Sequence, residues 1–451
     1  MILNKSYHSQ PLPINYILRK FPSLFLIICV GFCSCSEEYN SGQSQAPTYH
    51  TEPAAPDIYL AGITSNGIHP IATYWKNGYA IPLTDGSNNA EAFSIVVSGD
   101  DAFVAGYEYN GMYNVAKYWK NGIAVPLTDG TGPAMAHSIT LSGADVYVAG
   151  YEGNATTKTA KYWKNGKAVS LTDGTNDAEA HSIVVDGNDI YVAGDEHIGV
   201  NDVAKYWKNG KSISLTDGSK ESHAYSIAVS GTDIYVAGSE KSGLNENMVA
   251  EYWKNGTVFH LTDGSNNARC NSITVSGDMV YAAGAECKDG NFFVAKYWLN
   301  GDAVAITDSS NYSMANAIVV QDHDIYLAGK ELKGALLQDS SVVLYWKNGS
   351  KAPLPNPSNS VGFTNSVFIY NNYIQVMDEN RTVSYPRVTH STKPGIVSLV
   401  EIFSSSSKKS KNTPKQNYTH KNNSPFISKV LSSSRLLSSG KHHDVAKSKR
   451  K

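Results

Sequence analysis

The hydrophobic pattern between residues 57 and 371 consists of short apolar runs separated by polar turns that contain glycine. One representative stretch reads HSIVV (181–185), DIYVAG (189–194), VAKYW (203–207) and SISLT (212–216). Runs of this length, rich in β-branched and aromatic residues and bounded by Gly, Asn and Asp, are typical of strands rather than helices. The stretch therefore predicts four short antiparallel strands, which we call a to d in chain order.

This unit of four runs recurs along the chain with a nearly constant period. All 7 Trp follow a Tyr in strand c, at spacings of 44, 44, 44, 46, 45 and 48 residues. A period of this size, built from four strands, is typical of a β-propeller blade. A residue that recurs in every copy is expected to serve blade packing, so the Tyr-Trp pairs are assigned to the core. The tryptophans are Trp75, Trp119, Trp163, Trp207, Trp253, Trp298 and Trp346.

Turn residues mark the ends of the runs. Asn-Gly, the strongest short hairpin signal because both residues adopt positive φ, separates strands c and d in every copy. A glycine such as Gly187 separates strands a and b, except in the copy that reads VQDHDI at 320–325. The Asp-Gly of the recurring LTDG, as at Asp173, is interpreted as turn chemistry.

The two ends of the repeated region complement each other. The first copy begins at a strand b (DIYLAG, 57–62), whereas a spare strand a follows the last copy (NSVFIYN, 365–371). If the late strand completes the first unit, residues 57–371 form an all-β, seven-bladed β-propeller of four-stranded antiparallel blades, closed by a C-terminal strand. Residues 372–400 contain degenerate extra strands, and the alternative is that 373–385 belong to a degenerate eighth blade.

The repeats resemble kelch-type β-propeller blades. Strand b ends in YVAG and is followed by an aromatic-bearing strand, although the kelch Gly-Gly is Ala-Gly in this chain. The chain as a whole is similar to bacterial cell-surface lipoproteins with propeller repeats of this YWKNG kind. The resemblance covers about residues 57–371 and implies a fold, not an activity, because propellers host lyases, oxidases, glycosidases and pure binding platforms alike.

The N-terminal residues indicate export. The apolar run 21–34 follows Arg19 and Lys20 and is too short for a membrane span but suits the core of a secretory signal. The sequence FCSCSEE then resembles a bacterial lipobox, in which Cys35, preceded by the small Ser34, is the expected lipidated residue. We therefore expect a signal and lipobox at 1–35, a flexible tether at 36–56, and a location in the cell envelope at the outer membrane or cell surface. The alternative is an ordinary cleaved signal or an uncleaved anchor.

Charge is distributed unevenly along the chain. Residues 401–451 carry 12 basic and 2 acidic residues, a net charge of +10, whereas the remainder carries 26 basic and 38 acidic residues. The basic tail lacks apolar periodicity and is expected to be disordered, with contact to an anionic surface as the alternative. We expect no nucleic-acid partner, and we expect a monomer.

The links between strands differ in their variability. The a–b and c–d turns are short and uniform, whereas the b–c and d–a links vary, and in a propeller these two sets lie on opposite faces. The variable face is the candidate binding surface. Exposed aromatic residues in or near its loops would stack on sugars or peptides, or else pack the loops: Tyr107, Tyr109, Tyr113, Phe292 and Phe293.

Two sets of residues are expected to border the mouth of the central channel on that face. The first set stands at the start of each strand a and varies while its surroundings do not, which suggests either recognition or capping of neighbouring backbone. It comprises Phe93, His137, His181, Tyr225, Asn271, Asn316 and Asn365.

The second set follows the Ala-Gly of strand b and is almost always glutamate. It comprises Glu108, Glu152, Glu196, Glu240, Glu286 and Glu331, with Thr64 in the first copy. A cross-strand ion pair with the Lys before Tyr-Trp, such as Glu196 with Lys205, explains most copies, but Glu240 faces Glu251 and Glu331 faces Leu344. Such pairs contribute only about 0–1 kcal/mol. A shared cation over the channel, for which Ca²⁺ suits oxygen ligands, is therefore the second interpretation.

Histidines near these glutamates support an alternative function. His137, His181, His197 and His223 lie in successive copies, where histidine with carboxylate could perform acid/base chemistry or bind a metal. No nucleophile motif and no fixed metal-ligand spacing accompany them. Separately, Cys270 and Cys287 flank one a–b hairpin and could form a disulfide in an exported protein, or remain as two free thiols.

Together these patterns favour a non-catalytic, exported, lipid-anchored platform that binds a glycan or a protein through the variable face of the propeller. The alternative is a propeller lyase or hydrolase that uses the histidine and glutamate cluster at the channel mouth. A catalytic site should break the repeat with a few convergent residues, whereas a platform spreads its variation over several blades, and the sequence is closer to the second pattern. No cofactor other than Ca²⁺ is suggested.

Overall fold

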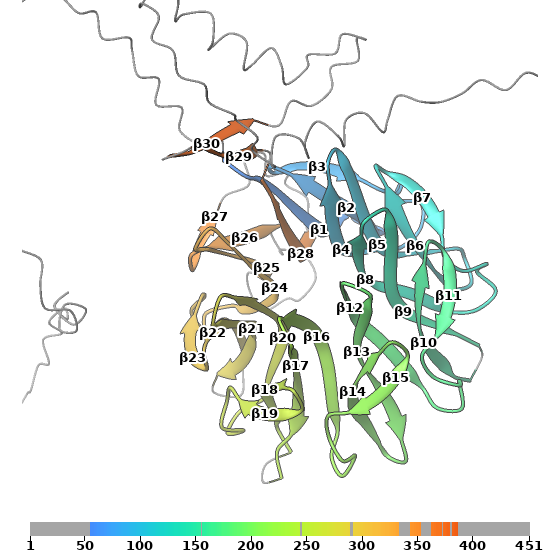
Figure 1. Cartoon of the computed structure of the whole chain (residues 1–451). Helices are drawn as coiled ribbons and strands as arrows, with labels where there is room; N and C mark the ends of the chain where they lie inside the picture. Colours follow the sequence, from blue (N-terminus) through green and yellow to red (C-terminus); the bar gives the residue numbers. More distant parts are fainter. Residues whose placement is uncertain are drawn as a thin grey trace, which may run out of the picture. The chain divides into compact units, whose positions relative to one another are not determined.

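The structure, a computed structural model, describes residues 55–154, 156–243, 246–288, 292–332, 343–352 and 362–371, and the backbone of 373–378 and 381–386. Every regular element in these ranges is a β-strand (Figure 1). No helix among them is long and apolar enough to cross a membrane. The predicted signal, lipobox Cys35, tether and basic tail lie outside the described residues.

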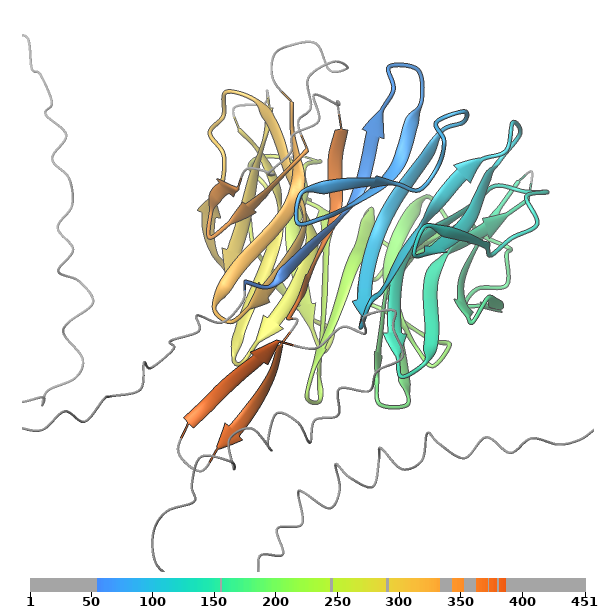
Figure 2. The ribbon, with the colours of Figure 1, turned by 90° about the horizontal axis from the view of Figure 1, so that it is seen from above.

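Seven four-stranded antiparallel sheets form the blades of a ring, with the first strand of each blade innermost (Figures 1 and 2). Blade 1 contains β28 (Gly362–Tyr370), β1 (Asp57–Ser65), β2 (Pro70–Lys76) and β3 (Tyr79–Pro82). Blade 2 contains β4 (Ala90–Ser98), β5 (Asp101–Tyr109), β6 (Asn114–Lys120) and β7 (Ile123–Pro126). Blade 3 contains β8 (Ala134–Ser142), β9 (Asp145–Gly153), β10 (Lys158–Lys164) and β11 (Lys167–Ser170). Blade 4 contains β12 (Ala178–Asp186), β13 (Asp189–Ile198), β14 (Asn201–Lys208) and β15 (Lys211–Ser214). Blade 5 contains β16 (Ser222–Ser230), β17 (Asp233–Lys241), β18 (Met248–Lys254) and β19 (Thr257–His260). Blade 6 contains β20 (Ala268–Ser276), β21 (Met279–Lys288), β22 (Phe292–Leu299) and β23 (Asp302–Ala305). Blade 7 contains β24 (Tyr312–Gln321), β25 (Asp324–Leu332), β26 (Leu344–Lys347) and β27 (Ser350–Ala352).

The ring closes through a strand from the far end of the repeats. β28 pairs antiparallel with β1, with Leu60 opposite Val367, so the first blade is assembled from both ends of the repeated region. The prediction of seven blades closed by a late strand is confirmed. β29 (Tyr373–Asp378) and β30 (Arg381–Pro386) form a separate two-stranded sheet and not an eighth four-stranded blade.

The tryptophans are the main packing residues between blades. All seven are at most 2% exposed. Trp119 of blade 2, for instance, packs in one cluster with Tyr59 and Ala61 of blade 1. Burial of such large apolar side chains between adjacent sheets is the dominant stabilising contribution, and the assignment of the tryptophans to the core is confirmed.

A β-bulge interrupts each innermost strand at the same place. In β12 the register shifts between Ala180 and Ser182, so His181 has no partner on β13. The innermost strands are longer than the sequence suggests, and the first predicted set of channel residues lies within them, one at each bulge, rather than at their start. The bulge also brings the carbonyl oxygen of Glu179 against Gly194, where a Cβ atom would lie 2.0 Å away. This close approach explains the recurring Ala-Gly of strand b.

The serine after the bulge links neighbouring blades. Ser182 Oγ accepts a hydrogen bond from Ile227 N of the next blade at 3.3 Å. Five other seams carry the same serine bond, with Ser94, Ser138, Ser226, Ser272 and Ser366 as acceptors. The bulge residue itself is thus free to differ from blade to blade, because the serine supplies the constant contact.

The predicted turns are present on the uniform face. The Asn of each Asn-Gly turn has φ between 50° and 52°, and its side chain reaches back to strand b, as when Asn209 Nδ2 donates to Asp189 Oδ1 at 2.8 Å. In blade 7 the exceptional VQDHDI turn is made by Asp322 and His323, both with positive φ. On the opposite face, in the d–a links, the LTDG aspartates are also turn residues, because Asp173 Oδ1 accepts bonds from the backbone N and the hydroxyl of Thr175.

The disulfide considered for blade 6 is not formed. Cys270 and Cys287 are free thiols. In the strand register Cys270 lies opposite Gly284 and Cys287 lies opposite Phe293, so the two thiols sit at different levels of the hairpin. The second of the two alternatives, free thiols, is therefore the one observed.

Candidate binding site at the channel mouth

Three positions in every blade are neighbours at the loop-face end of the innermost strand. They are the bulge residue, the residue two places before it, and the strand-b residue opposite that one in the register. All three vary among the blades, whereas the residues around them are mostly alanine, glycine and serine in every blade. In blade 4 they are His181, Glu179 and Asp195. We call the seven bulge residues the bulge ring.

The bulge ring divides into two arcs. In blades 6, 7 and 1 the ring residue is asparagine, and each side-chain amide donates to a backbone carbonyl of the next blade. The bonds run from Asn271 to Ala315 O at 2.9 Å, from Asn316 to Thr364 O at 3.0 Å, and from Asn365 to Ala92 O at 3.0 Å. We call this the Asn arc, and here the capping interpretation of these residues is confirmed.

The other four bulge residues, in blades 2 to 5, form a continuous aromatic row that we call the His arc. Ring centroids are separated by 5.2 Å from Phe93 to His137, 5.3 Å from His137 to His181, and 5.8 Å from His181 to Tyr225. No described residue of this arc caps the next blade as the asparagines do. The polar atoms of its histidines turn instead to carboxylates.

Glu179 is the carboxylate between His137 and Lys158. Its Oε1 lies 2.6 Å from Lys158 Nζ, and its Oε2 lies 3.5 Å from His137 Nε2. Burial alone would raise the pKa of Glu179, but the nearby His137, His181 and Lys158 together lower it to about 2, so the carboxylate is ionised. Burial lowers the pKa of His137, which therefore stays neutral near pH 7.

Asp195 joins two histidines of successive blades. Its Oδ2 accepts from His181 Nε2 at 3.2 Å and from His223 Nδ1 at 3.1 Å, and its side chain is only 10% exposed. Burial opposes ionisation of this aspartate, but the two imidazoles outweigh it and hold the pKa of Asp195 well below its usual range. In return, the charge of Asp195 overcomes burial and raises the pKa of both His181 and His223.

A polar cavity of about 280 Å³ opens beside these carboxylates on the loop face. It is lined by Lys158, Asp177, Ala178, Glu179, Asp195, His197 and Asp202. His197, predicted with the other histidines, lies here through its bond to Asp202 Oδ1 at 2.9 Å. Four carboxylates against one lysine make the cavity electronegative, which favours neutral or cationic ligands over anionic ones.

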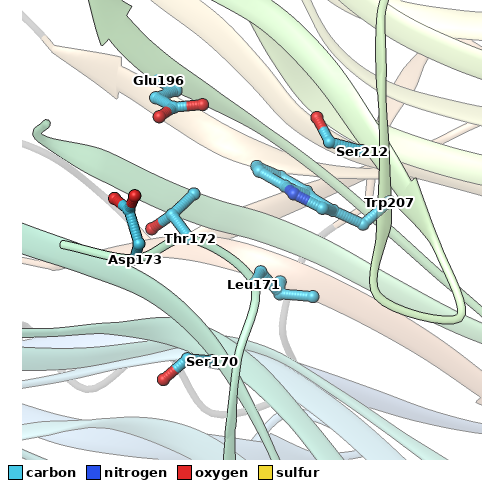
Figure 3. A pocket seen from close by; sticks show the side chains of 7 residues that line it. All are labelled: Ser170, Leu171, Thr172, Asp173, Glu196, Trp207 and Ser212. Carbon is cyan, nitrogen blue, oxygen red and sulfur yellow. The ribbon is translucent and has the colours of Figure 1, made fainter. Parts of the chain in front are cut away.

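The glutamate set lies elsewhere. Glu196 lines a cleft between blades 3 and 4 with Thr172, Asp173 and Trp207, and its Oε2 is 2.5 Å from Lys205 Nζ (Figure 3). Three other blades contain the same ion pair, in which Glu108, Glu152 and Glu286 contact Lys117, Lys161 and Lys296, respectively. Glu331 forms its ion pair with Lys351 of strand d. Five of the six glutamates therefore have a lysine partner, and the shared Ca²⁺ site over the channel stays a prediction.

Blades 1 and 5 depart from this ion pair. In blade 1 Thr64 shares a hydroxyl hydrogen bond with Thr73 at 2.9 Å. In blade 5 the lysine is replaced by Glu251, which is fully buried, and His260 Nδ1 lies 2.8 Å from its Oε2. Burial and the neighbouring charge of Glu240 raise the pKa of Glu251 to about 8.

The predicted aromatic residues fall into two groups. Tyr107 belongs to the site, because its ring centroid lies 5.8 Å from that of Phe93. Tyr109 and Phe293 serve loop packing instead. The hydroxyl of Tyr109 donates to Gly111 O at 2.9 Å, and the ring of Phe293 packs edge-on against Tyr312. Tyr113 and Phe292 are half-buried.

Comparison with known proteins finds only distant structural likenesses. No protein-family model matches the sequence, and neither does any curated protein. Among solved structures, a puromycin-hydrolysing peptidase of Mycobacterium tuberculosis is 11% identical with a TM-score of 0.44, and an acylaminoacyl peptidase of Pyrococcus horikoshii is 12% identical with a TM-score of 0.41. Each match covers 66% of this chain but only 54% and 52% of the respective peptidase, so the chain spans about half their length. A TolB-like protein of Agrobacterium tumefaciens is 10% identical with a TM-score of 0.37, over 70% of this chain and 98% of that one. These likenesses carry no information about activity.

Proposed function

We propose that this protein is an exported glycan-binding propeller whose site is the cavity beside the His arc. The observation that carries the proposal is the pair of ionised, largely buried carboxylates, Glu179 and Asp195, beside the His arc, whereas the asparagines of the other arc cap the backbone of the next blade. Carboxylates accept hydrogen bonds from sugar hydroxyls, and the half-buried rings of Phe93 and Tyr225 flank the histidines of the same arc. The cavity volume of about 280 Å³ suits one small polar unit such as a sugar residue.

The charge of the cavity defines the class of glycan. Asp177, Glu179, Asp195 and Asp202 outnumber Lys158 in its lining. Uronic and sialic acids would bring a further carboxylate against these groups, and like charges at short range cost several kcal/mol in a buried site. The expected ligands are therefore neutral sugars or amino sugars.

Binding of immobilised oligosaccharides to the full-length protein tests this function. Neutral and amino-sugar oligosaccharides should be retained and uronic-acid oligosaccharides should not. Asp195→Asn should weaken retention at least about tenfold, because it removes an ionised hydrogen-bond acceptor. Glu196→Gln is the matched control, since the adjacent side chain pairs with Lys205 in the cleft between blades. Equal effects of the two substitutions, or retention of acidic sugars alone, would refute the proposal.

A second candidate function is acid/base catalysis on a bound glycan or ester. It is favoured by the hydrogen-bonded series His181, Asp195 and His223, in which both imidazoles have raised pKa values. No Ser, Thr or Cys is among the described residues that line the cavity, so the nucleophile would have to be water. Release of reducing ends from a retained oligosaccharide, abolished by His181→Ala with little change in thermal unfolding, would establish this function over simple binding.

Cellular location forms part of the proposal. The lipobox-like FCSCSEE and the resemblance to kelch-like, YWKNG-type surface lipoproteins support an N-terminal lipid anchor at Cys35 and an envelope location. Labelling of cells with a palmitate analogue should modify the wild-type protein and not the Cys35→Ala variant. Labelling that persists in Cys35→Ala but is lost in Cys33→Ala would move the anchor to the neighbouring cysteine.

A further inference from the structure

Two histidines and one glutamate converge between blades 3 and 4. One donor atom from each of His137, Glu179 and His181 lies within 4.8 Å of the other two. Two imidazoles and a carboxylate form the ligand set of many zinc sites that keep an open coordination position. They come from innermost strands β8 and β12, which lie beside each other in adjacent blades.

His137 provides an independent sign that a ligand belongs here. Its Nε2 is buried from solvent and makes no hydrogen bond among the described residues. The nearest acceptor, Glu179 Oε2, is 3.5 Å away, which is long for a hydrogen bond. Two ligands of one tetrahedral zinc ion, each at about 2.0–2.1 Å from the metal, are separated by about 3.3 Å. The observed separation therefore fits a shared metal better than a direct bond.

The surroundings of the three residues also fit a metal centre. Ligating carboxylates and imidazoles are commonly oriented by outer hydrogen bonds. Lys158 holds the other oxygen of Glu179 at 2.6 Å, and Asp195 lies 3.2 Å from Nε2 of His181.

A neighbouring set of possible ligands is less suited to a metal. Asp195, Asp202 and His223 also lie within 4.8 Å of one another. Their atoms are already satisfied, however, because Asp195 Oδ2 accepts from two imidazoles and Asp202 Oδ1 pairs with His197. The geometry thus favours the first set.

We propose that His137, Glu179 and His181 bind one divalent transition metal ion, for which Zn²⁺ has the matching ligand preference. Three protein ligands leave at least one coordination position for water or for an oxygen of a ligand in the channel. The proposal rests on the side-chain geometry and does not require that the ligand of the cavity be a glycan.

The chain itself offers substitutions that should leave the fold intact. The corresponding positions in adjacent blades hold Phe93, Met135 and Tyr225. His137→Phe, Glu179→Met and His181→Tyr therefore replace each ligand by a residue that the same bulge already accommodates. His69→Ala is a control, because this histidine contacts Asn89 and belongs to neither set.

Competition of the chelator-treated, full-length protein with a chromophoric zinc chelator tests the proposal. The wild type and His69→Ala should hold one zinc ion at least about 100-fold more tightly than each of the three ligand variants. Co²⁺ should give the visible absorption of tetrahedral cobalt only in the wild type and His69→Ala, and circular dichroism should show all four variants folded. A tight site that survives all three ligand substitutions, or a wild type no tighter than those variants, would overturn the proposal. Zinc binding without glycan retention would leave this inference standing and refute only the proposed function, and the reverse result would do the opposite.

Discussion

The two arcs of the bulge ring contain the same β-bulge, but its side chains make different contacts in each arc. In blades 6, 7 and 1 the bulge residue is asparagine, and its side-chain amide donates a hydrogen bond to a backbone carbonyl of the next blade. In blades 2 to 5 the same bulge presents aromatic and imidazole rings, which contact one another and the buried carboxylates. Because a serine follows six of the seven bulges and links the blades there, the bulge residue can serve either stability or recognition.

The largest expected effect is a difference in the free energy of unfolding between substitutions in the Asn arc and substitutions in the His arc. Asn316→Ala and Asn365→Ala should each lower the free energy of unfolding by about 1–3 kcal/mol, because a buried carbonyl loses its donor. His137→Phe in the His arc should change it by less than about 1 kcal/mol, since the bulge of blade 2 already holds phenylalanine. Denaturant unfolding at constant m-value measures both. Equal losses in the two arcs would contradict the division.

The second effect concerns blade 5, in which Glu251 replaces the lysine of the Glu–Lys ion pair that blades 2, 3, 4 and 6 share. Glu251, with a pKa near 8 in the folded protein against an ordinary 4.5, binds more protons folded than unfolded between these values. Stability should therefore fall as the pH rises from about 4.5 to about 8. Glu251→Lys restores the ion pair of the other blades and should raise the unfolding free energy at pH 8 by about 1–2 kcal/mol.

The pH dependence identifies the cause of that gain. At pH 4.5 the wild-type carboxyl is protonated in both states to a large extent, so the advantage of Glu251→Lys should shrink there. A gain of equal size at both pH values would show that the substitution improves packing and not charge. Glu196→Gln in blade 4 should not raise the free energy of unfolding at pH 8 by a comparable amount.

The smallest effect is expected on the uniform face. Lys164 pairs with Asp145 at 2.8 Å, and its counterparts recur in most blades, but both side chains are more than one third exposed to solvent. Lys164→Ala should leave both the unfolding free energy and any ligand or zinc affinity within measurement error. A measurable loss of ligand affinity would place function on the face that we assign to structure alone.

The sequence was sufficient for the scaffold because the scaffold repeats. The tryptophan period, the Asn-Gly turns and the complementary ends at DIYLAG and NSVFIYN each reflect a contact made in every blade, so the seven-bladed ring could be predicted before the structure. All seven bulge residues were also identified, although not that each stands at a bulge inside a longer strand.

The site was only half predicted, and the reason lies in the pleat of strand b. Adjacent residues of a strand face opposite sides. Glu196 was predicted as a site residue because glutamate recurs at this position in most blades. That recurrence reflects an ion pair of the scaffold, whereas the neighbouring Asp195 faces the histidines. Glu179 lies on the innermost strand, two residues before His181, and belongs to neither predicted set. The signal that would have found them is variability, since the residues at the positions of Asp195 and Glu179 vary among the blades whereas the scaffold residues recur.

The double substitution His137→Asn and His181→Asn tests the central claim most directly, because it converts part of the His arc into the Asn arc. Asparagine at these bulges should cap the carbonyls of Ala180 and Ala224, as Asn271 caps Ala315. The account predicts an unfolding free energy within about 1 kcal/mol of the wild type or above it, together with loss of the tight zinc site. A destabilised protein that still binds zinc as tightly as the wild type would contradict it.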